Sequence, residues 1–203
     1  MVVNDIKKVR PSKENIVTKA IAQENDGVLF LGTPAKSDKD AELSFSEVVS
    51  IGPMATQPEQ CPGLEVGDKI VHNKFAGSYI ATKELDELYK VMGGYSVMAI
   101  LEDINNINES TIHPTSNRIL VAVKFLDETD DGLFIPTEEA SNKQLEDLSY
   151  GTVIKIGPSC KLGYKVGEIA AYPPYAGETV RLGRSSKEPT LRVLIEEDIL
   201  LSI

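Results

Sequence analysis

Residues with reactive side chains are few in this chain and lie far apart. The 203-residue sequence has two histidines, His72 and His113, and two cysteines, Cys61 and Cys160. Neither histidine neighbours a serine, cysteine or aspartate in the arrangement of a nucleophile and its base, which predicts no catalytic residue. No CxxC occurs and no histidine lies at zinc-ligand spacing from a cysteine, so we predict no metal site and two free thiols.

Phosphate, nucleic-acid and membrane binding are disfavoured in the same way. The pair Gly93-Gly94 lacks the Lys-Ser/Thr that follows a phosphate-binding loop, and Gly67-Asp68 and Gly167-Glu168 are typical of turns between strands. The net charge is −10, and no basic stripe marks a nucleic-acid or anionic-membrane surface. No apolar run approaches the roughly 18 residues of a membrane helix, and residues 1–10 show no secretory signal. We therefore predict no cofactor and no enzymatic activity.

Two apolar tripeptides stand out because polar residues surround them. Val28-Leu29-Phe30 follows the polar residues 23–27, and Leu133-Phe134-Ile135 follows the acidic residues 127–132. Such flanks bury too little apolar surface to order themselves, so residues 24–46 and 127–147 are predicted to be disordered, with each tripeptide free to meet a partner. A short buried strand is the alternative for the same pattern.

The chain contains an internal repeat in constant order. Its offset is 103 residues near the start and 95 by the last match, and the drift falls in loops. We predict two domains, residues 1–105 and 106–203, joined by the polar seam at 105–110. The matched pairs are Val9-Arg10-Pro11 with Ile112-His113-Pro114, residues 48–53 with 153–158, Val66-Gly67-Asp68 with Val166-Gly167-Glu168, Phe75-Ala76-Gly77 with Tyr175-Ala176-Gly177, and Glu102-Asp103-Ile104 with Glu197-Asp198-Ile199.

The elements that must carry these residues are short strands. Residues 119–123, 152–156 and 191–195 are β-rich apolar runs bounded by glycine and proline, and only residues 81–92 leave a helical turn or a long hairpin open. Many short strands separated by turns predict an all-β fold, a small sandwich or barrel in each copy.

The ordered marks of the second copy resemble the GroES-type co-chaperonin family. The resemblance covers nearly the whole chain, with the first copy more diverged, and it implies two tandem GroES-like small β-barrels. The tandem arrangement is similar to the plastid form, with divergent phage co-chaperonins as the second choice. The marks are His113-Pro114, Asn117-Arg118-Ile119-Leu120-Val121, Gly132-Leu133-Phe134-Ile135-Pro136, Ile156-Gly157-Pro158, Val166-Gly167-Glu168, Tyr175-Ala176-Gly177 and Glu196-Glu197-Asp198-Ile199-Leu200.

The resemblance implies a lid for a folding chamber. Each barrel would extend a loop whose tripeptide, Val28-Leu29-Phe30 or Leu133-Phe134-Ile135, docks on the apical domain of a nucleotide-bound, GroEL-type chaperonin ring. The chains would form a homo-oligomeric ring through terminal strands near residues 6–9 and 193–201 and assist ATP-dependent protein folding. The compartment would be the plastid stroma or apicoplast; the alternative is cytoplasm, including that of a phage-infected bacterium.

Two departures from the family and two other functions stay open. Asp26 and Asp131 replace the first of two glycines before each tripeptide. Residues 158–165 are too few for most of the family's roof hairpin, so the dome would be partly open or covered by residues 53–65 of the first copy alone. A GroES-fold scaffold or adaptor without chaperonin binding is one alternative. A zinc-type alcohol dehydrogenase is the other, but its GxGxxG motif and zinc ligands are missing.

Overall fold

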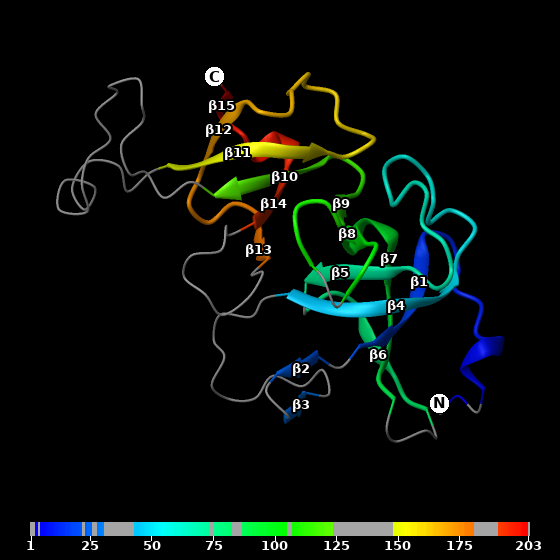
Figure 1. Ribbon diagram of the computed structural model, residues 1–203. Helices are drawn as coiled ribbons and strands as arrows, with labels where there is room; N and C mark the ends of the chain where they lie inside the picture. The colour runs from blue at the N-terminus through cyan, green and yellow to red at the C-terminus, as the bar shows by residue number, and fades with distance from the viewer. Residues whose placement is uncertain are drawn as a thin grey trace, which may run out of the picture. The chain divides into compact units, whose positions relative to one another are not determined.

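The computed structural model divides the chain into two compact units, Met1–Ser116 and Asn117–Ile203 (Figure 1). Within the described part of the chain, no helix is long and apolar enough to cross a membrane. The structure describes residues 3, 5–21, 23–25, 28–30, 43–73, 75–82, 87–104, 107–123, 148–180 and 191–202.

The first unit is a seven-stranded antiparallel sheet in the order β6-β7-β1-β4-β5-β8-β9. Where residues 81–92 are described, they form no helix. They connect β6 to β7 and continue into β7, and these two strands pair as a hairpin. The elements are η1 (Ile6–Lys8), β1 (Asn15–Ala20), β4 (Leu43–Ile51), β5 (Lys69–Asn73), β6 (Ser78–Ile80), β7 (Tyr89–Gly93), η2 (Gly94–Ser96), β8 (Val97–Leu101) and β9 (Ile112–Pro114), and β2 (Gln23–Asn25) and β3 (Val28–Phe30) pair separately.

The second unit is a six-stranded antiparallel sheet in the order β13-β14-β10-β11-β12-β15. The predicted all-β fold is confirmed in both units. The elements are β10 (Arg118–Val123), β11 (Ser149–Ile156), β12 (Ile169–Tyr172), β13 (Glu178–Val180), β14 (Leu191–Ile195), η3 (Glu196–Asp198) and β15 (Leu201–Ser202).

Strand register fixes which residues of the two units are equivalent. On β5 and β8, Ile70 pairs with Ile100; on β12 and β15, Ala170 pairs with Ser202. Strand β15 is therefore the counterpart of β8, and η3 is the counterpart of η2. The sequence match of Glu102-Asp103-Ile104 with Glu197-Asp198-Ile199 is wrong, because the acidic residues of η3 correspond to Gly94–Ser96.

Strand β9 comes from the start of the second repeat but lies in the first unit. It pairs with β8, so Ile112 opposes Leu101 and Pro114 opposes Ala99. The boundary between the compact units accordingly falls after Ser116 in the chain, whereas the repeat places its seam at residues 105–110. The second sheet has no described strand beyond β15.

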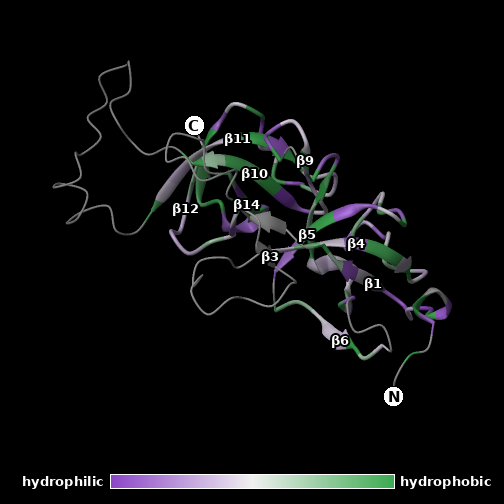
Figure 2. Ribbon diagram, turned by 60° about the horizontal axis from the view of Figure 1, so that its bottom comes forward, coloured by the Kyte–Doolittle hydropathy of each residue, from purple (hydrophilic) through white to green (hydrophobic). Residues whose placement is uncertain are grey.

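Both sheets bury apolar side chains as the β-rich runs predict. On β10, Ile119, Leu120 and Val121 are all fully buried, so both faces of this strand are covered, and Figure 2 shows its hydrophobic run in green. The turns before β6 and β13 require glycine. Gly77 and Gly177 have φ of 74° and 67°, and a Cβ there would lie 2.3 Å from a backbone carbonyl oxygen.

The two β4–β5-type loops contain no strand, so neither forms a roof hairpin. Residues 52–68 and 157–168 contain turns, bends and irregular backbone but no strand. In the first unit Ala55, Cys61 and Leu64 are buried and belong to the same core cluster as Ile16 and Ile70. This loop folds onto its own sheet, and its covering of a dome in an assembly stays a prediction.

Candidate partner-binding sites

The first predicted binding tripeptide forms a strand outside the main sheet. Val28–Phe30 is β3, which pairs with β2 alone in a two-stranded sheet. Strands β2, β3 and β4 include residues 24–25, 28–30 and 43–46, so the prediction of disorder over 24–46 is wrong for these residues. The second tripeptide, Leu133-Phe134-Ile135, and all of 127–147 lie outside the described residues. Contact of either tripeptide with a chaperonin stays a prediction.

The segments that carry the tripeptides begin and end on adjacent strands. In the first unit Ala20 at the end of β1 pairs with Ser46 on β4, and the Ile21 amide donates to the Phe45 carbonyl at 3.0 Å. In the second unit Val123 at the end of β10 pairs with Gly151 on β11. Because paired strands lie about 5 Å apart, each segment leaves and re-enters its sheet at one point.

A buried histidine of the first unit lies on β5, next to the part of β4 where the chain re-enters the sheet after the first tripeptide. His72 is fully buried; its Nδ1 donates to the Asn73 carbonyl at 2.8 Å, so its Nε2 accepts from the Ser46 hydroxyl at 2.9 Å. Burial lowers the pKa of His72 to about 4, and the charge on Lys90 acts in the same direction. The imidazole is therefore neutral near pH 7.

The Ser46–His72 pair is one that sequence reasoning missed, since the two residues lie on different strands. Its hydrogen bonding resembles that of a nucleophile with its base. However, Ser46 is 2% exposed and His72 is 0% exposed, so no substrate reaches them. The neighbouring Thr18 hydroxyl is also buried, and it has no hydrogen-bond partner among the described residues. These buried polar side chains have a structural role. We call them the polar layer, which consists of Thr18, Ser46, His72 and Lys90.

The second unit fills the equivalent space with an aromatic ring. By strand register, Tyr172 replaces His72, Gly151 replaces Ser46 and Arg192 replaces Lys90. The Arg192 guanidinium lies 5.6 Å from the centroid of the Tyr172 ring, a cation–π distance. Burial raises the pKa of Tyr172. A Cβ on Gly151 would lie 2.9 Å from the Ala122 carbonyl oxygen, so glycine keeps β10 and β11 close beside the ring.

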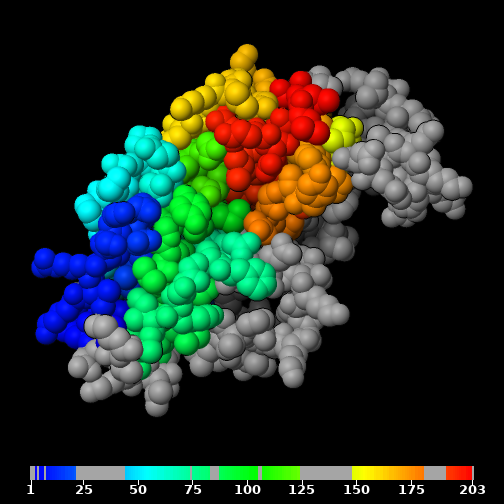
Figure 3. Space-filling model, turned by 180° about the vertical axis from the view of Figure 1, so that it is seen from behind, coloured from blue at the N-terminus to red at the C-terminus, as the bar shows by residue number. Residues whose placement is uncertain are grey.

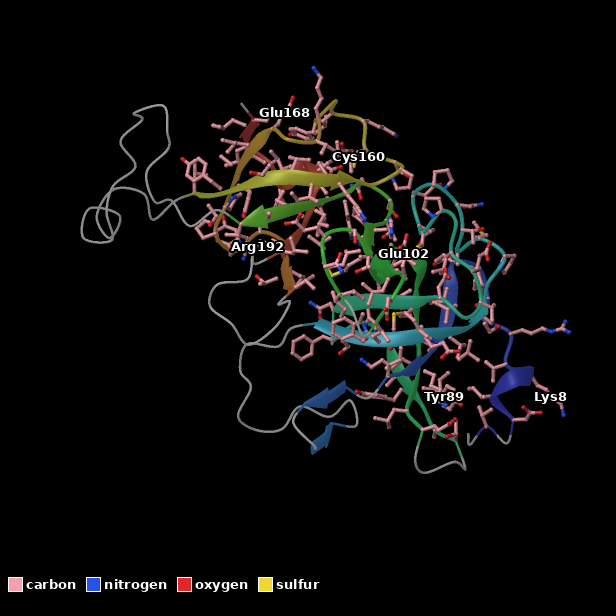
Figure 4. The ribbon with its side chains drawn as sticks, in the orientation of Figure 1. Lys8, Tyr89, Glu102, Cys160, Glu168 and Arg192 are labelled. Atoms are coloured by element: carbon pink, nitrogen blue, oxygen red, sulfur yellow. The ribbon has the colours of Figure 1, made fainter. Side chains whose placement is uncertain are left out.

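Cys61 and Cys160 are not joined in a disulfide, in line with the predicted thiols. The Cys160 thiol donates to the Arg118 carbonyl at 3.5 Å, and burial, with the nearby Glu196 carboxylate, raises its pKa to about 11. The thiol is protonated at neutral pH and thus a poor nucleophile or metal ligand. Figure 4 shows Cys160 on the loop after β11. In the described ranges, no group of three or more His, Cys, Asp or Glu side chains gathers as a metal site would require.

Among the described strands, β15 is the last of the second sheet, and apolar side chains at this edge are exposed. In the first unit β9 runs along β8, where Met98 is 9% exposed and Ala99 is 0% exposed. Their counterparts on the second sheet, Leu200 and Leu201, are 60% and 46% exposed. The C-terminal residues, red in Figure 3, accordingly lie at the surface. An unpaired strand edge with exposed leucines is typical of an interface.

The chain carries a second copy of the segment that covers β8. Val9-Arg10-Pro11 matches Ile112-His113-Pro114, and each run leads into the same unusual turn, with φ of 51° at Lys13 and 52° at Ser116. We call residues 9–13 the N-terminal arm. The terminal strand expected at 6–9 is wrong, because Ile6–Lys8 forms a 3-10 turn. Of the expected contact region 193–201, β14 pairs on both sides, and only β15 is at an edge.

Comparison with known proteins gives the same double pattern. The family model described as "Chaperonin 10 Kd subunit" matches residues 8–101 and again 111–203. A protein named Co-chaperonin GroES from Fervidobacterium nodosum is 34% identical over 98 residues, 47% of this chain and 99% of the relative. Its namesake from Fusobacterium nucleatum subsp. polymorphum is 29% identical over 97 residues, 46% of this chain and 98% of the relative.

Proposed function

Because this chain belongs to the chaperonin 10 Kd subunit family in both of its halves, we propose that it is a co-chaperonin lid for a GroEL-type chaperonin ring. The observation that carries the proposal is the duplicated family domain, with a loop rooted at the same strand pair in each copy. The lid binds the apical domains of the nucleotide-bound ring and assists ATP-dependent folding. Its compartment stays a prediction, with plastid stroma or apicoplast ahead of cytoplasm.

Chaperonin binding falls to the two tripeptides, Val28-Leu29-Phe30 and Leu133-Phe134-Ile135. Burying each apolar side chain contributes roughly 1.5–3 kcal/mol, while ordering a loop costs about 2–5 kcal/mol. A single loop is then a weak ligand. Several loops in one assembly bind strongly through effective concentration, and they release together when the ring changes state.

The test is capture of a GroEL-type ring with and without ATP. Leu29→Asp and Phe134→Asp should each weaken ATP-dependent capture, and the double variant should abolish it, because a carboxylate cannot enter an apolar groove. Val66→Asp is the control, since Val66 is 64% exposed on a turn outside both loops. Normal capture by the double variant would reject the tripeptide assignment. Failure of the unmodified chain to bind with ATP would favour the scaffold alternative.

We propose that chains assemble head to tail through the open edge of β15. The N-terminal arm of one copy would add to β15 of another, as β9 adds to β8 within the chain. Such a heterologous contact repeats from copy to copy and closes into a ring when the rotation allows. The support is the exposure of Leu200 and Leu201 where the equivalent residues of the first unit are buried.

Leu200→Asp tests the assembly. A charge at this position would be buried beneath the incoming arm, so the variant should stay a single chain at concentrations where the unmodified protein forms larger species by native mass spectrometry. The control is Leu162→Asp, at a site 59% exposed on the loop before β12. An unmodified protein that is monomeric at tens of micromolar would overturn the proposed assembly.

A further inference from the structure

The loop between β4 and β5 is longer than its counterpart in the second unit by a definite insertion. On the N-terminal side Ala55 corresponds to Cys160, because each amide donates to the carbonyl of the preceding Gly52 or Gly157. On the C-terminal side Gly63 corresponds to Gly163, with φ of 80° and 83°. Seven residues, 56–62, lie between these marks in the first loop and two, 161–162, in the second. Five residues are therefore extra, and any contiguous choice of five includes Gln60; we take 56–60 as the inserted segment.

Gln60 connects the inserted segment to the turn that follows β9. Its backbone carbonyl accepts a hydrogen bond from the Ser116 hydroxyl, and its side-chain Oε1 accepts from the Tyr95 amide at 3.1 Å. Ser116 is 3% exposed. The insertion thus touches η2 on one side and the residue just beyond β9 on the other, all within the first unit.

Further contacts of the same turn fix β9 against β8. The Thr115 amide donates to the Met98 carbonyl at 3.1 Å, and the Thr115 hydroxyl donates to the Val97 carbonyl at 2.5 Å. Just before β9 begins, the Glu102 amide donates to the Thr111 carbonyl at 2.9 Å, and in the middle of the strand His113 Nε2 lies 2.7 Å from a carboxylate oxygen of Glu102. Strand β9 is held at both ends, and the inserted loop supplies one of the anchors.

We propose that residues 56–60 are a clasp that locks β9 onto β8, so that the β8 edge stays closed to the N-terminal arm of another copy. The need for a clasp follows from the repeat, since the arm and β9 carry equivalent sequences and both could add to either edge. With β9 locked onto β8, an incoming arm can add at β15 but not at β8, which gives head-to-tail assembly a direction. That consequence rests on the proposed assembly, whereas the clasp does not.

In the proposed contact between copies, the arm would meet no such clasp. Lys13 takes the place of Ser116 in the arm, and the loop of the second unit lacks the counterpart of Gln60. The second loop is instead tied to its own unit, where a Glu196 carboxylate oxygen accepts from the Lys161 and Leu162 amides at 2.7 and 3.0 Å. We therefore expect whole chains to leave and rejoin the assembly, while β9 of each chain stays paired with β8 of the same chain.

The test is amide hydrogen exchange of residues 97–101 and 111–116 in dilute, monomeric protein. Ser116→Ala removes the hydroxyl that meets Gln60, and exchange in these segments should rise by about 2- to 10-fold, as expected for one buried hydrogen bond. Lys13→Ala makes the matched change in the equivalent turn and should leave them unaltered. Unchanged exchange in Ser116→Ala would overturn the clasp.

A stronger variant deletes residues 56–60 and gives the first loop the spacing of the second. Exchange at 97–101 and 111–116 should rise further, and at higher concentration native mass spectrometry should show a broader range of species, because β8 becomes a second acceptor. Even if the deletion prevents folding of the first unit, Ser116→Ala still decides the matter. A clasp confirmed by exchange in a protein that never assembles would reject only the head-to-tail proposal.

Discussion

The two units have the same strand order and register but fill the space beneath their loops with opposite chemistry. The first unit places a small serine beside a histidine, in a layer with Thr18 and Lys90. The second unit places Gly151 beside Tyr172, with Arg192 over the ring. A smaller residue on one strand accompanies a larger one on the next, so total volume is nearly conserved while polarity is not. Register therefore fixes where a side chain lies, and packing volume limits its size.

The same contrast holds for the loops after β4 and β11. In the second unit a residue that follows strand β14 anchors the loop, because the buried carboxylate of Glu196 accepts hydrogen bonds from two loop amides. Its counterpart is Gly94, where a Cβ would lie 2.8 Å from the Ala55 carbonyl oxygen. In the first unit the loop supplies the anchor, through the Gln60 side chain to the Tyr95 amide. In one unit the anchor that holds the loop belongs to the sheet, and in the other it belongs to the loop itself. Only the first unit, where the loop supplies Gln60, has a loop residue that contacts Ser116.

The largest expected effect is on the stability of the second unit, where Tyr172 fills the space beneath the loop. Tyr172→Ala should destabilise the second unit by about 3–5 kcal/mol, because it leaves a cavity at a fully buried position. His72→Ala in the first unit should cost less, on the order of 1–3 kcal/mol, since it removes a smaller ring and leaves one hydroxyl to re-pair. The measurement is urea denaturation followed by residue-resolved NMR of each unit. Equal losses in both units, or a greater loss in His72→Ala, would mean that the two layers contribute alike.

The fold could be read from the sequence because its signals are local and occur twice. Gly77 and Gly177 mark equivalent turns that no other residue fits, and the apolar run of β10 is buried as its pattern predicts. The C-terminal match failed for a physical reason. Glu102-Asp103-Ile104 copies the letters of η3, yet η2, its structural equivalent, has the unrelated sequence Gly94-Tyr95-Ser96. A backbone turn of this kind places little demand on side-chain identity.

Contacts across strands were the part that one sequence could not supply. Ser46 and His72 become neighbours only once β4 and β5 pair, and nothing in their local sequence marks the pairing. Likewise, the letters of Ile112-His113-Pro114 show that it repeats Val9-Arg10-Pro11, but not that it completes the sheet of the preceding copy. The loop length difference was visible, and its use as an anchor for Ser116 was not.

The smaller expected effect concerns the polar layer. It is a loss of folding stability of the first unit at acidic pH that the second unit does not share. Burial lowers the pKa of His72 from its ordinary 6.5 to about 4. Between pH 6.5 and 4 the unfolded chain therefore binds a proton that the folded unit does not, so stability is lost as the pH falls through this range and is fully present above it. A difference of roughly 2.5 in pKa corresponds to about 3 kcal/mol at most.

The two units together provide the control for this prediction. The second unit has no histidine within β10 to β15, so it shows how a unit without a buried imidazole responds to acid. In urea denaturation followed by NMR, the first unit should lose more stability than the second between pH 6.5 and 4. His72→Gln should remove that excess, because an amide does not titrate. An excess that persists in His72→Gln, or parallel loss in both units of the unmodified chain, would show that the buried imidazole does not set the difference.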